Sequence, residues 1–137
     1  MTSHTNISIL DRAGIAAMNI EFPDLEVPVL TGNQRQGDVY VLRATSSHIG
    51  LPIGAGVAVV EAESNSANTH VLVGEGLWQA AIKRWDSLVQ GWLTVPEGSE
   101  AFLIHTEEHN ALGIGPGTYE IRRQREWDGW RWHQVAD

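Results

Sequence analysis

Short apolar segments alternate with turn-forming residues from Gly37 to Asp137. This spacing of apolar runs and turns is typical of all-β sandwiches and barrels. We therefore predict a β domain over residues 37–137, with strands at 39–43, 57–63, 69–73, 77–85, 89–95, 101–105, 118–126 and 130–135.

Two local features refine this assignment. The apolar residues of 77–85 also fall at helical spacing, and we assign this run to a strand. Asp128-Gly129 stands between two alternating segments and predicts a hairpin, because type I′ turns need positive φ angles that these residues tolerate. About eight short strands around one core predict an all-β, single-domain antiparallel β-sandwich or jelly-roll-like barrel.

Residues 1–36 have a different pattern. They combine a polar start and a short apolar patch at 15–18 with Pro23 and Pro28, which restrict the backbone to extended forms. We predict an extended N-terminal arm or edge segment that precedes the domain.

Composition narrows the class of protein. The 137 residues are enough for one core, and the absence of cysteine excludes disulfides and thiolate sites. The net charge of −8 opposes binding to phosphate backbones, so we expect no nucleic-acid partner. The chain contains no run long enough to cross a bilayer and no signal-peptide pattern at its start, so we expect a cytoplasmic or virion protein without a membrane partner.

The charge is unevenly distributed. Residues 120–137 contain four arginines and four acidic residues and are neutral, so the whole negative excess precedes them. The acidic body of one copy could therefore meet the arginine-bearing strand of another, although a solvated acidic surface explains the same composition.

Candidate metal ligands gather after the predicted strand 101–105. His105 and His109 flank Glu107 and Glu108, but residues four apart on a continuous strand stand about 13 Å from each other. Because bonds from zinc to imidazole nitrogen are only about 2.1 Å long, a shared ion requires a bend at 106–108. His70, on an earlier strand, could then complete a cupin-like zinc or iron site.

A structural interpretation of the same residues needs no cofactor. In it, His105 ends a strand with its ring half buried, and the polar residues that follow form a solvated loop.

The strand at 118–126 carries several arginines. Alternation places Tyr119, Ile121 and Arg123 on one face and Arg122 on the other. Ion pairs with carboxylates explain these arginines structurally, whereas a cluster of Arg122, Arg123 and Arg125 would bind an oxyanion.

Tryptophan is abundant, and half of the six tryptophans lie near the C-terminus. Large flat side chains anchor interfaces because they bury much area with few torsions to freeze. The predicted contact surface comprises Phe22, Leu25, Arg122, Arg125, Trp127, Trp130 and Trp132.

Three motifs carry a resemblance to a known group. The stretch from His105 to His109, the Pro116-Gly-Thr-Tyr119 turn and the Arg123-Gln-Arg-Glu-Trp127 ending resemble small uncharacterised bacterial and phage proteins. Members show a Gly-His-x-His turn, a His-Glu-Glu-His stretch and a closing Gln-Arg-Glu-aromatic motif. This chain departs from them at Asn68-Thr-His70 and at Thr106. The resemblance implies a shared fold over residues 37–137.

Two functions follow from these patterns. The first is a non-enzymatic structural or interaction protein, specifically a phage virion component such as a head decoration or capsid-associated protein, which works as a homo-oligomer or within a larger assembly. The alternative is a metal-dependent, cupin-like enzyme or small-ligand-binding protein that uses His70, His105 and His109 with a glutamate. Loop serines without a nucleophile elbow give no support to nucleophilic catalysis.

Overall fold

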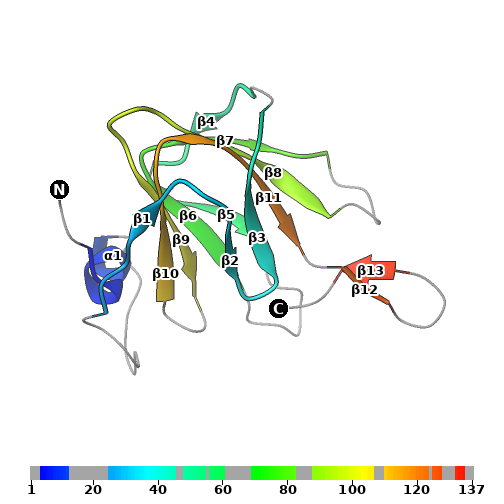
Figure 1. The fold of residues 1–137 in the computed structure, drawn as a ribbon, viewed down its shortest axis with the longest axis horizontal. Helices are drawn as coiled ribbons and strands as arrows, with labels where there is room; N and C mark the ends of the chain where they lie inside the picture. Colours follow the sequence, from blue (N-terminus) through cyan, green and yellow to red (C-terminus); the bar gives the residue numbers. More distant parts are fainter. Residues whose placement is uncertain are drawn as a thin grey trace.

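The protein is a β-sandwich made of two stacked sheets, seen in a computed structural model (Figure 1). The structure describes residues 4–12, 25–45, 48–54, 56–60, 69–82, 88–106, 110–123, 125–127 and 132–134. Within these residues no helix is long and apolar enough to cross a membrane. The all-β sandwich predicted from the sequence is confirmed, and its sheets are open rather than closed into a barrel.

Sheet 1 has five strands. In spatial order they are β1 (Val29–Leu30), β10 (Asn110–Ile114), β9 (Ala101–His105), β6 (His70–Gly74) and β5 (Val57–Val60). All neighbours are antiparallel except β1, which runs parallel to β10.

Sheet 2 has six strands and is antiparallel throughout. In spatial order they are β2 (Gln34–Gln36), β3 (Val39–Arg43), β11 (Gly117–Arg123), β8 (Val89–Val95), β7 (Leu77–Ala80) and β4 (Leu51–Pro52). A separate hairpin of β12 (Arg125–Trp127) and β13 (Trp132–Gln134) projects from the end of the sandwich opposite the helix α1 (Figure 1).

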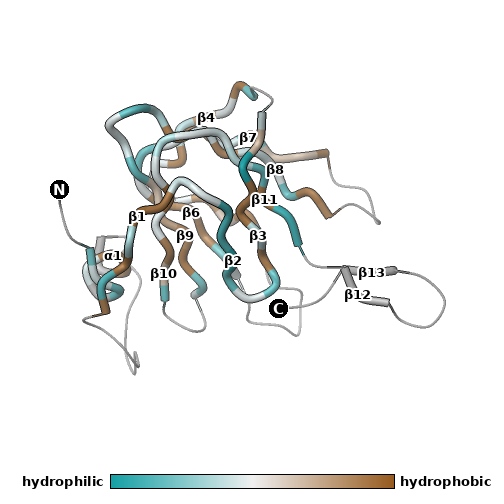
Figure 2. Tube along the Cα trace, viewed as in Figure 1, coloured by the Kyte–Doolittle hydropathy of each residue, from teal (hydrophilic) through white to brown (hydrophobic). Residues whose placement is uncertain are grey.

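The main core lies between the two sheets. Apolar side chains alternate with half-buried ones along β3, β8 and β11, so each strand turns one face to the other sheet. Figure 2 shows this alternation as brown positions between white and teal ones, whereas β2 is hydrophilic along its length. The fully buried members include Val41, Leu72, Leu93, Leu103, Tyr119 and Ile121.

Gly91 makes room for the largest side chain of this core. A Cβ atom on Gly91 would lie 2.5 Å from Cζ2 of the buried Trp78 and 2.4 Å from the carbonyl oxygen of Gln79. A side chain at this position of β8 would therefore displace both the Trp78 ring and the neighbouring strand.

A second, smaller core lies on the outer face of sheet 1, under the helix α1 (Asn6–Arg12). Ile9 and Leu10 are fully buried there, against Val73, Phe102 and Ile104. Sheet 1 is thus covered on both faces, by sheet 2 on one side and by α1 on the other.

Thr5 and Ser8 explain where α1 begins. The Thr5 hydroxyl oxygen accepts a hydrogen bond from the Ser8 N–H group at 3.2 Å, and the Ser8 hydroxyl oxygen accepts one from the Thr5 N–H group at 2.9 Å. This reciprocal pair satisfies two N–H groups at the helix start, as a capping box does. The Asn6 side-chain oxygen also accepts the Ala111 N–H group at 3.1 Å, which ties the helix to β10.

The structure describes part of the segment that was predicted to be an extended N-terminal arm or edge segment. Within residues 1–36, β1 and β2 are edge strands, one in each sheet, as an edge segment would be. The helix α1 was not predicted, and it packs on the domain instead of extending from it. The apolar patch at 15–18 lies outside the described residues.

Several strand boundaries differ from the prediction. The described residues form thirteen strands rather than about eight, because β1, β2, β4 and β10 were assigned to loops or to the N-terminal segment and one predicted strand is divided in two. The ambiguous run at 77–85 begins as the strand β7, which ends at Ala80. The long strand expected at 118–126 is divided, since β11 ends at Arg123 and β12 begins at Arg125.

We predict that Leu10→Ala destabilises the whole domain, because Leu10 is part of the core under α1. Removing a fully buried leucine side chain costs about 2–5 kcal/mol. Urea unfolding monitored by tryptophan fluorescence should show a lower midpoint with a single transition. Leu25→Ala is the matched control, because Leu25 is more than half exposed, and it should change stability by less than about 0.5 kcal/mol. An unchanged midpoint for Leu10→Ala would mean that α1 does not contribute to the fold.

Candidate functional site

Two of the predicted metal ligands meet inside the sandwich. His70 on β6 and His105 on β9 are direct partners in the strand register, and their rings lie 4.5 Å apart, edge to face. Their exposed fractions are 0% and 1%. Strand pairing thus supplies the condition on which the prediction for His70 depended, and His105 is fully buried rather than half buried.

Alternation fixes the direction of both rings. Leu72 lies two residues after His70 on β6, and Leu103 lies two residues before His105 on β9. Both leucines belong to the core between the sheets. Residues two apart on a strand share a face. The two imidazoles therefore point toward sheet 2 and occupy one end of the core.

The side chain of Gln36, on β2 of the opposite sheet, forms hydrogen bonds with His70 and with two other residues of sheet 1. Its amide oxygen lies 2.9 Å from Nδ1 of His70. Its amide nitrogen donates to the carbonyl oxygen of Leu103 at 2.9 Å and to the side-chain oxygen of Asn110 at 3.3 Å. One glutamine side chain therefore links β2 to three strands of sheet 1.

These contacts fix the tautomer of His70. The carbonyl oxygen of Leu103 can only accept a hydrogen bond, so the nitrogen of the Gln36 amide must face it. The amide oxygen then faces His70, and Nδ1 must carry the proton that it accepts. In the neutral ring, Nε2 is left as the nitrogen with a lone pair, the one that a metal would bind.

Arg123 extends the same polar end of the core within sheet 2. Arg123 is buried and follows Tyr119 and Ile121 on the inward face of β11, as alternation predicts. It pairs with Val39, which in turn pairs with Gln36 on β2. We call His70, His105, Asn110, Gln36 and Arg123 the polar row.

The neighbouring arginines do not share this face. Nε of Arg122 lies 3.7 Å from a carboxylate oxygen of Glu120, and both side chains are substantially solvent-accessible. A pair of this kind contributes little to stability. Arg122 and Arg123 lie on opposite faces of β11, so they do not form the joint oxyanion site that the sequence allowed.

The remaining predicted site residues have mixed outcomes. Glu107, His109, Phe22 and Trp130 lie outside the described residues. Within the described ranges, no three histidine, aspartate or glutamate side chains come together as a metal would require. Trp127 and Trp132 are direct partners across the β12–β13 hairpin, where Arg125 pairs with Gln134, and their side chains lie outside the described part. Leu25 is exposed.

A surface that sequence reasoning missed lies at the outer margin of sheet 2. Ile49, Leu51 and Ile82 are 93%, 77% and 89% exposed. Leu51 belongs to β4, the last strand of the sheet, and pairs with Trp78 of β7, the strand that Ile82 follows. We call these three residues and Pro52 the apolar edge. The sequence carried a signal for it, since residues 44–60 contain no Asp, Glu, Lys or Arg.

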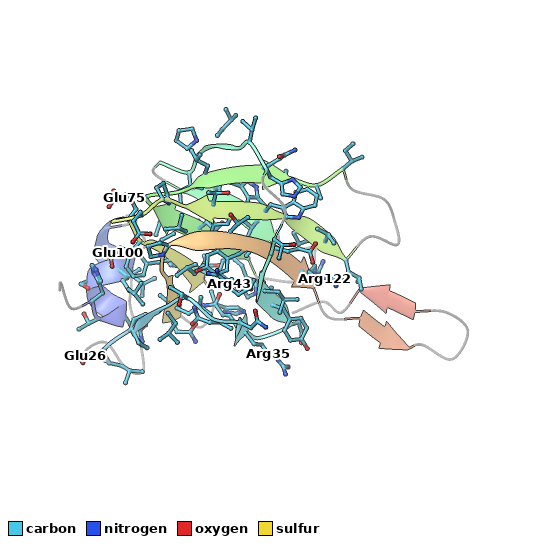
Figure 3. All side chains as sticks on the ribbon, turned by 45° about the horizontal axis from the view of Figure 1, so that its top comes forward. Glu26, Arg35, Arg43, Glu75, Glu100 and Arg122 are labelled. Atoms are coloured by element: carbon cyan, nitrogen blue, oxygen red, sulfur yellow. The ribbon has the colours of Figure 1, made fainter. Side chains whose placement is uncertain are left out.

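A second missed feature is a cavity of about 690 Å³ beside α1. Its walls come from the start of the described chain, the segment before β1, the turn between β8 and β9, and the residue before β11. Figure 3 shows two of its carboxylates, Glu26 and Glu100, at the α1 end of the molecule, with Arg122 toward the other end.

We predict that Gln36→Leu destabilises the protein by about 2–6 kcal/mol, because two buried polar groups each lose a hydrogen-bond partner, at about 1–3 kcal/mol each. These groups are Nδ1–H of His70 and the carbonyl of Leu103. Denaturant unfolding measures the change. Gln79→Leu makes the same substitution at an exposed position on β7 and should leave the midpoint nearly unchanged. Equal midpoints for the two variants would contradict the role assigned to Gln36.

Comparison with known proteins places the fold in a family. No curated protein and no solved structure matches this chain. One family model matches residues 35–124, which are 90 of the 137 residues, and its description is "Domain of unknown function (DUF8820)". The match contains the whole polar row and the apolar edge, and it leaves out α1 and the β12–β13 hairpin. Because it covers well over half of the chain, the protein belongs to the DUF8820 family.

Proposed function

We propose that this protein is a non-enzymatic interaction protein that works through contacts between copies, as a component of a larger assembly. The assembly that we propose is a phage virion, with this chain as a head decoration or capsid-associated protein. The observation that carries the proposal is the apolar edge of sheet 2.

The apolar edge differs from ordinary surface leucines and isoleucines. Single exposed apolar side chains are normal on a protein surface, whereas clustered ones mark contact sites. Five large apolar side chains are exposed in the described part of the chain, and Ile49, Leu51 and Ile82 are the three most exposed of them. All three lie on β4 and β7 or directly beside them.

Charge favours this edge as the place where two copies meet. A net charge of −8 makes copies repel each other over most of their surfaces. The stretches 44–60 and 76–82, which contain the apolar edge, have no Asp, Glu, Lys or Arg, and His48 is the one histidine in them. Two copies that approach along these stretches bury apolar area without bringing like charges together.

Pro52 favours contact between copies through side chains over pairing of their backbones. A proline on an edge strand has no N–H group to offer to another strand, which disfavours extension of the sheet into a neighbour. Docking through side chains of the apolar edge is therefore favoured over backbone pairing. Such contacts can form and stop at a defined number of copies, as an assembly protein requires.

The virion setting draws its support from the sequence. The motifs between His105 and Trp127 resemble those of small bacterial and phage proteins. The extended N-terminal arm is no longer part of this proposal, because α1 packs on its own domain. The described part of the N-terminal segment stabilises the fold and does not reach outward. The contact surface that we propose is therefore the apolar edge.

We predict that the purified protein self-associates and that Ile49→Glu combined with Ile82→Glu makes it monomeric. The two new carboxylates would face apolar surface and each other across the contact, which opposes association. Sedimentation velocity over a range of protein concentrations measures the oligomeric state.

The control for this experiment is Leu25→Glu, an exposed apolar residue away from β4 and β7. It should leave the oligomeric state unchanged. All three substitutions alter exposed positions, so thermal unfolding should confirm that each variant remains folded. A wild-type protein that stays monomeric at every concentration would overturn the proposal.

The contact between His70 and His105 favours a second function, the metal-dependent, cupin-like enzyme or small-ligand-binding protein. Two buried imidazoles lie side by side, and the Gln36 contact leaves Nε2 of His70 as the metal-competent nitrogen of the neutral ring. These residues fit a first pair of ligands for zinc or iron. The two described histidines could bind and orient such an ion, and the ion would supply Lewis-acid chemistry.

If this second function is correct, purified protein should bind zinc or iron in a fixed ratio, and His105→Gln should lose that metal. Elemental analysis after a titration with zinc or iron(II) provides the measurement. His48→Gln is the control, because His48 stacks on Trp92 at a ring distance of 4.0 Å in sheet 2, away from the polar row. Protein that retains neither metal after the titration would exclude this function.

A further inference from the structure

We propose that the cavity beside α1 binds a small organic cation with an apolar body. This site is independent of the self-association proposed above, because no residue that lines the cavity belongs to the apolar edge. The inference rests on the size of the cavity, the composition of its walls and the way in which one of its carboxylates is held.

The size and walls of the cavity suit a small molecule. Ligand pockets typically have volumes of about 300–1,000 Å³ and mostly apolar walls with a few polar groups that fix orientation. This cavity measures about 690 Å³. Its apolar lining residues are Val27, Pro28, Val29 and Pro116.

The charged groups of the cavity select the sign of the ligand. Three carboxylates line it, those of Glu26, Glu97 and Glu100, with the imidazole of His4 as the one basic side chain among the lining residues. If His4 is protonated, three negative charges and one positive charge leave two negative charges in excess. The cavity is therefore anionic in either state of His4, and an ammonium or amidinium group matches it.

Glu100 is positioned before any ligand arrives. One of its carboxylate oxygens lies 2.5 Å from Nε2 of His4, and its backbone carbonyl accepts the N–H group of Glu75 at 3.0 Å. A carboxylate held in place loses less conformational freedom when it binds a cation than a free surface glutamate does.

His4 is itself fixed by the fold. Its ring is buried and lies edge-on to Phe102, with ring centroids 4.7 Å apart, and its backbone carbonyl accepts the N–H group of Val27 at 2.7 Å. The wall that holds Glu100 is thus continuous with the core under α1. Glu26 and Glu97 are exposed at the margin of the cavity, and the contact with His4 distinguishes Glu100 from a freely solvated carboxylate.

The test is a binding titration on the full chain with matched pairs of probes. Calorimetry compares 1,6-diaminohexane with 1,6-hexanediol, and benzamidine with benzamide, so that each cation has a neutral partner of nearly the same shape. We expect at least one of the two cations to bind and both neutral partners to bind at least tenfold more weakly. Binding should also weaken as salt concentration rises, because the attraction is electrostatic.

Glu26→Gln combined with Glu97→Gln removes two carboxylates without touching the contact between His4 and Glu100. We expect this variant to bind the cation at least tenfold more weakly. Glu120→Gln is the matched control, since it removes a carboxylate from β11 outside the cavity, and it should bind as the wild type does. The variants are compared by thermal unfolding without ligand to confirm that they are folded.

Three results would overturn the proposal. They are a failure of both cations to bind, equal binding of a cation and its neutral partner, and equal losses in the cavity variant and in Glu120→Gln. The oligomeric state of the wild type does not enter this test, so its outcome is separate from that of the self-association experiment.

Discussion

The structure depends on the burial of β9 on both of its faces. All five residues of β9 are buried, and the strand lies at the centre of sheet 1. Its inward residues pack in the core between the sheets, while Phe102 and Ile104 form the floor under α1. A shift of this strand by one residue would exchange the side chains of the two cores and require both to repack. The position of β9 therefore also fixes His105 beside His70 and the Leu103 carbonyl beside Gln36.

Features that depend on local periodicity could be predicted from the sequence. The alternation of β3, β8 and β11 is strong, and so the sandwich and the facing of Tyr119, Ile121 and Arg123 followed from it. The helix α1 has only seven residues and begins at a Thr5–Ser8 cap without an acidic partner, a weak pattern. The strand β10 begins with Asn110 and contains Gly113, which favour turns, and its place is decided by pairing with β9.

The candidate sites were harder to predict, because they depend on contacts between residues that are far apart in the sequence. The contact between His70 and His105 was conditional on strand pairing, because their 35-residue separation in sequence gives no local signal. Gln36 contacts Leu103 across 67 positions and was assigned to the N-terminal segment. The cavity beside α1 combines residues that are far apart in the sequence, from His4 to Pro116. Conversely, the exposure of a single apolar residue cannot be read from the sequence, so Ile49 and Ile82 were not identified as surface residues.

The polar row has a structural consequence that holds with or without a ligand. Buried polar groups must find partners, and the Gln36 amide meets three of them only in one alignment of β2 against β6, β9 and β10. A slip of β6 by one residue would turn His70 toward α1 and place the next residue, Val71, in the core. Hydrophobic burial alone would give such a slip only a small free-energy cost, because Val71 is apolar and can also be buried in the core. The polar row therefore adds specificity of register where hydrophobic burial is least selective, at the end of the sandwich.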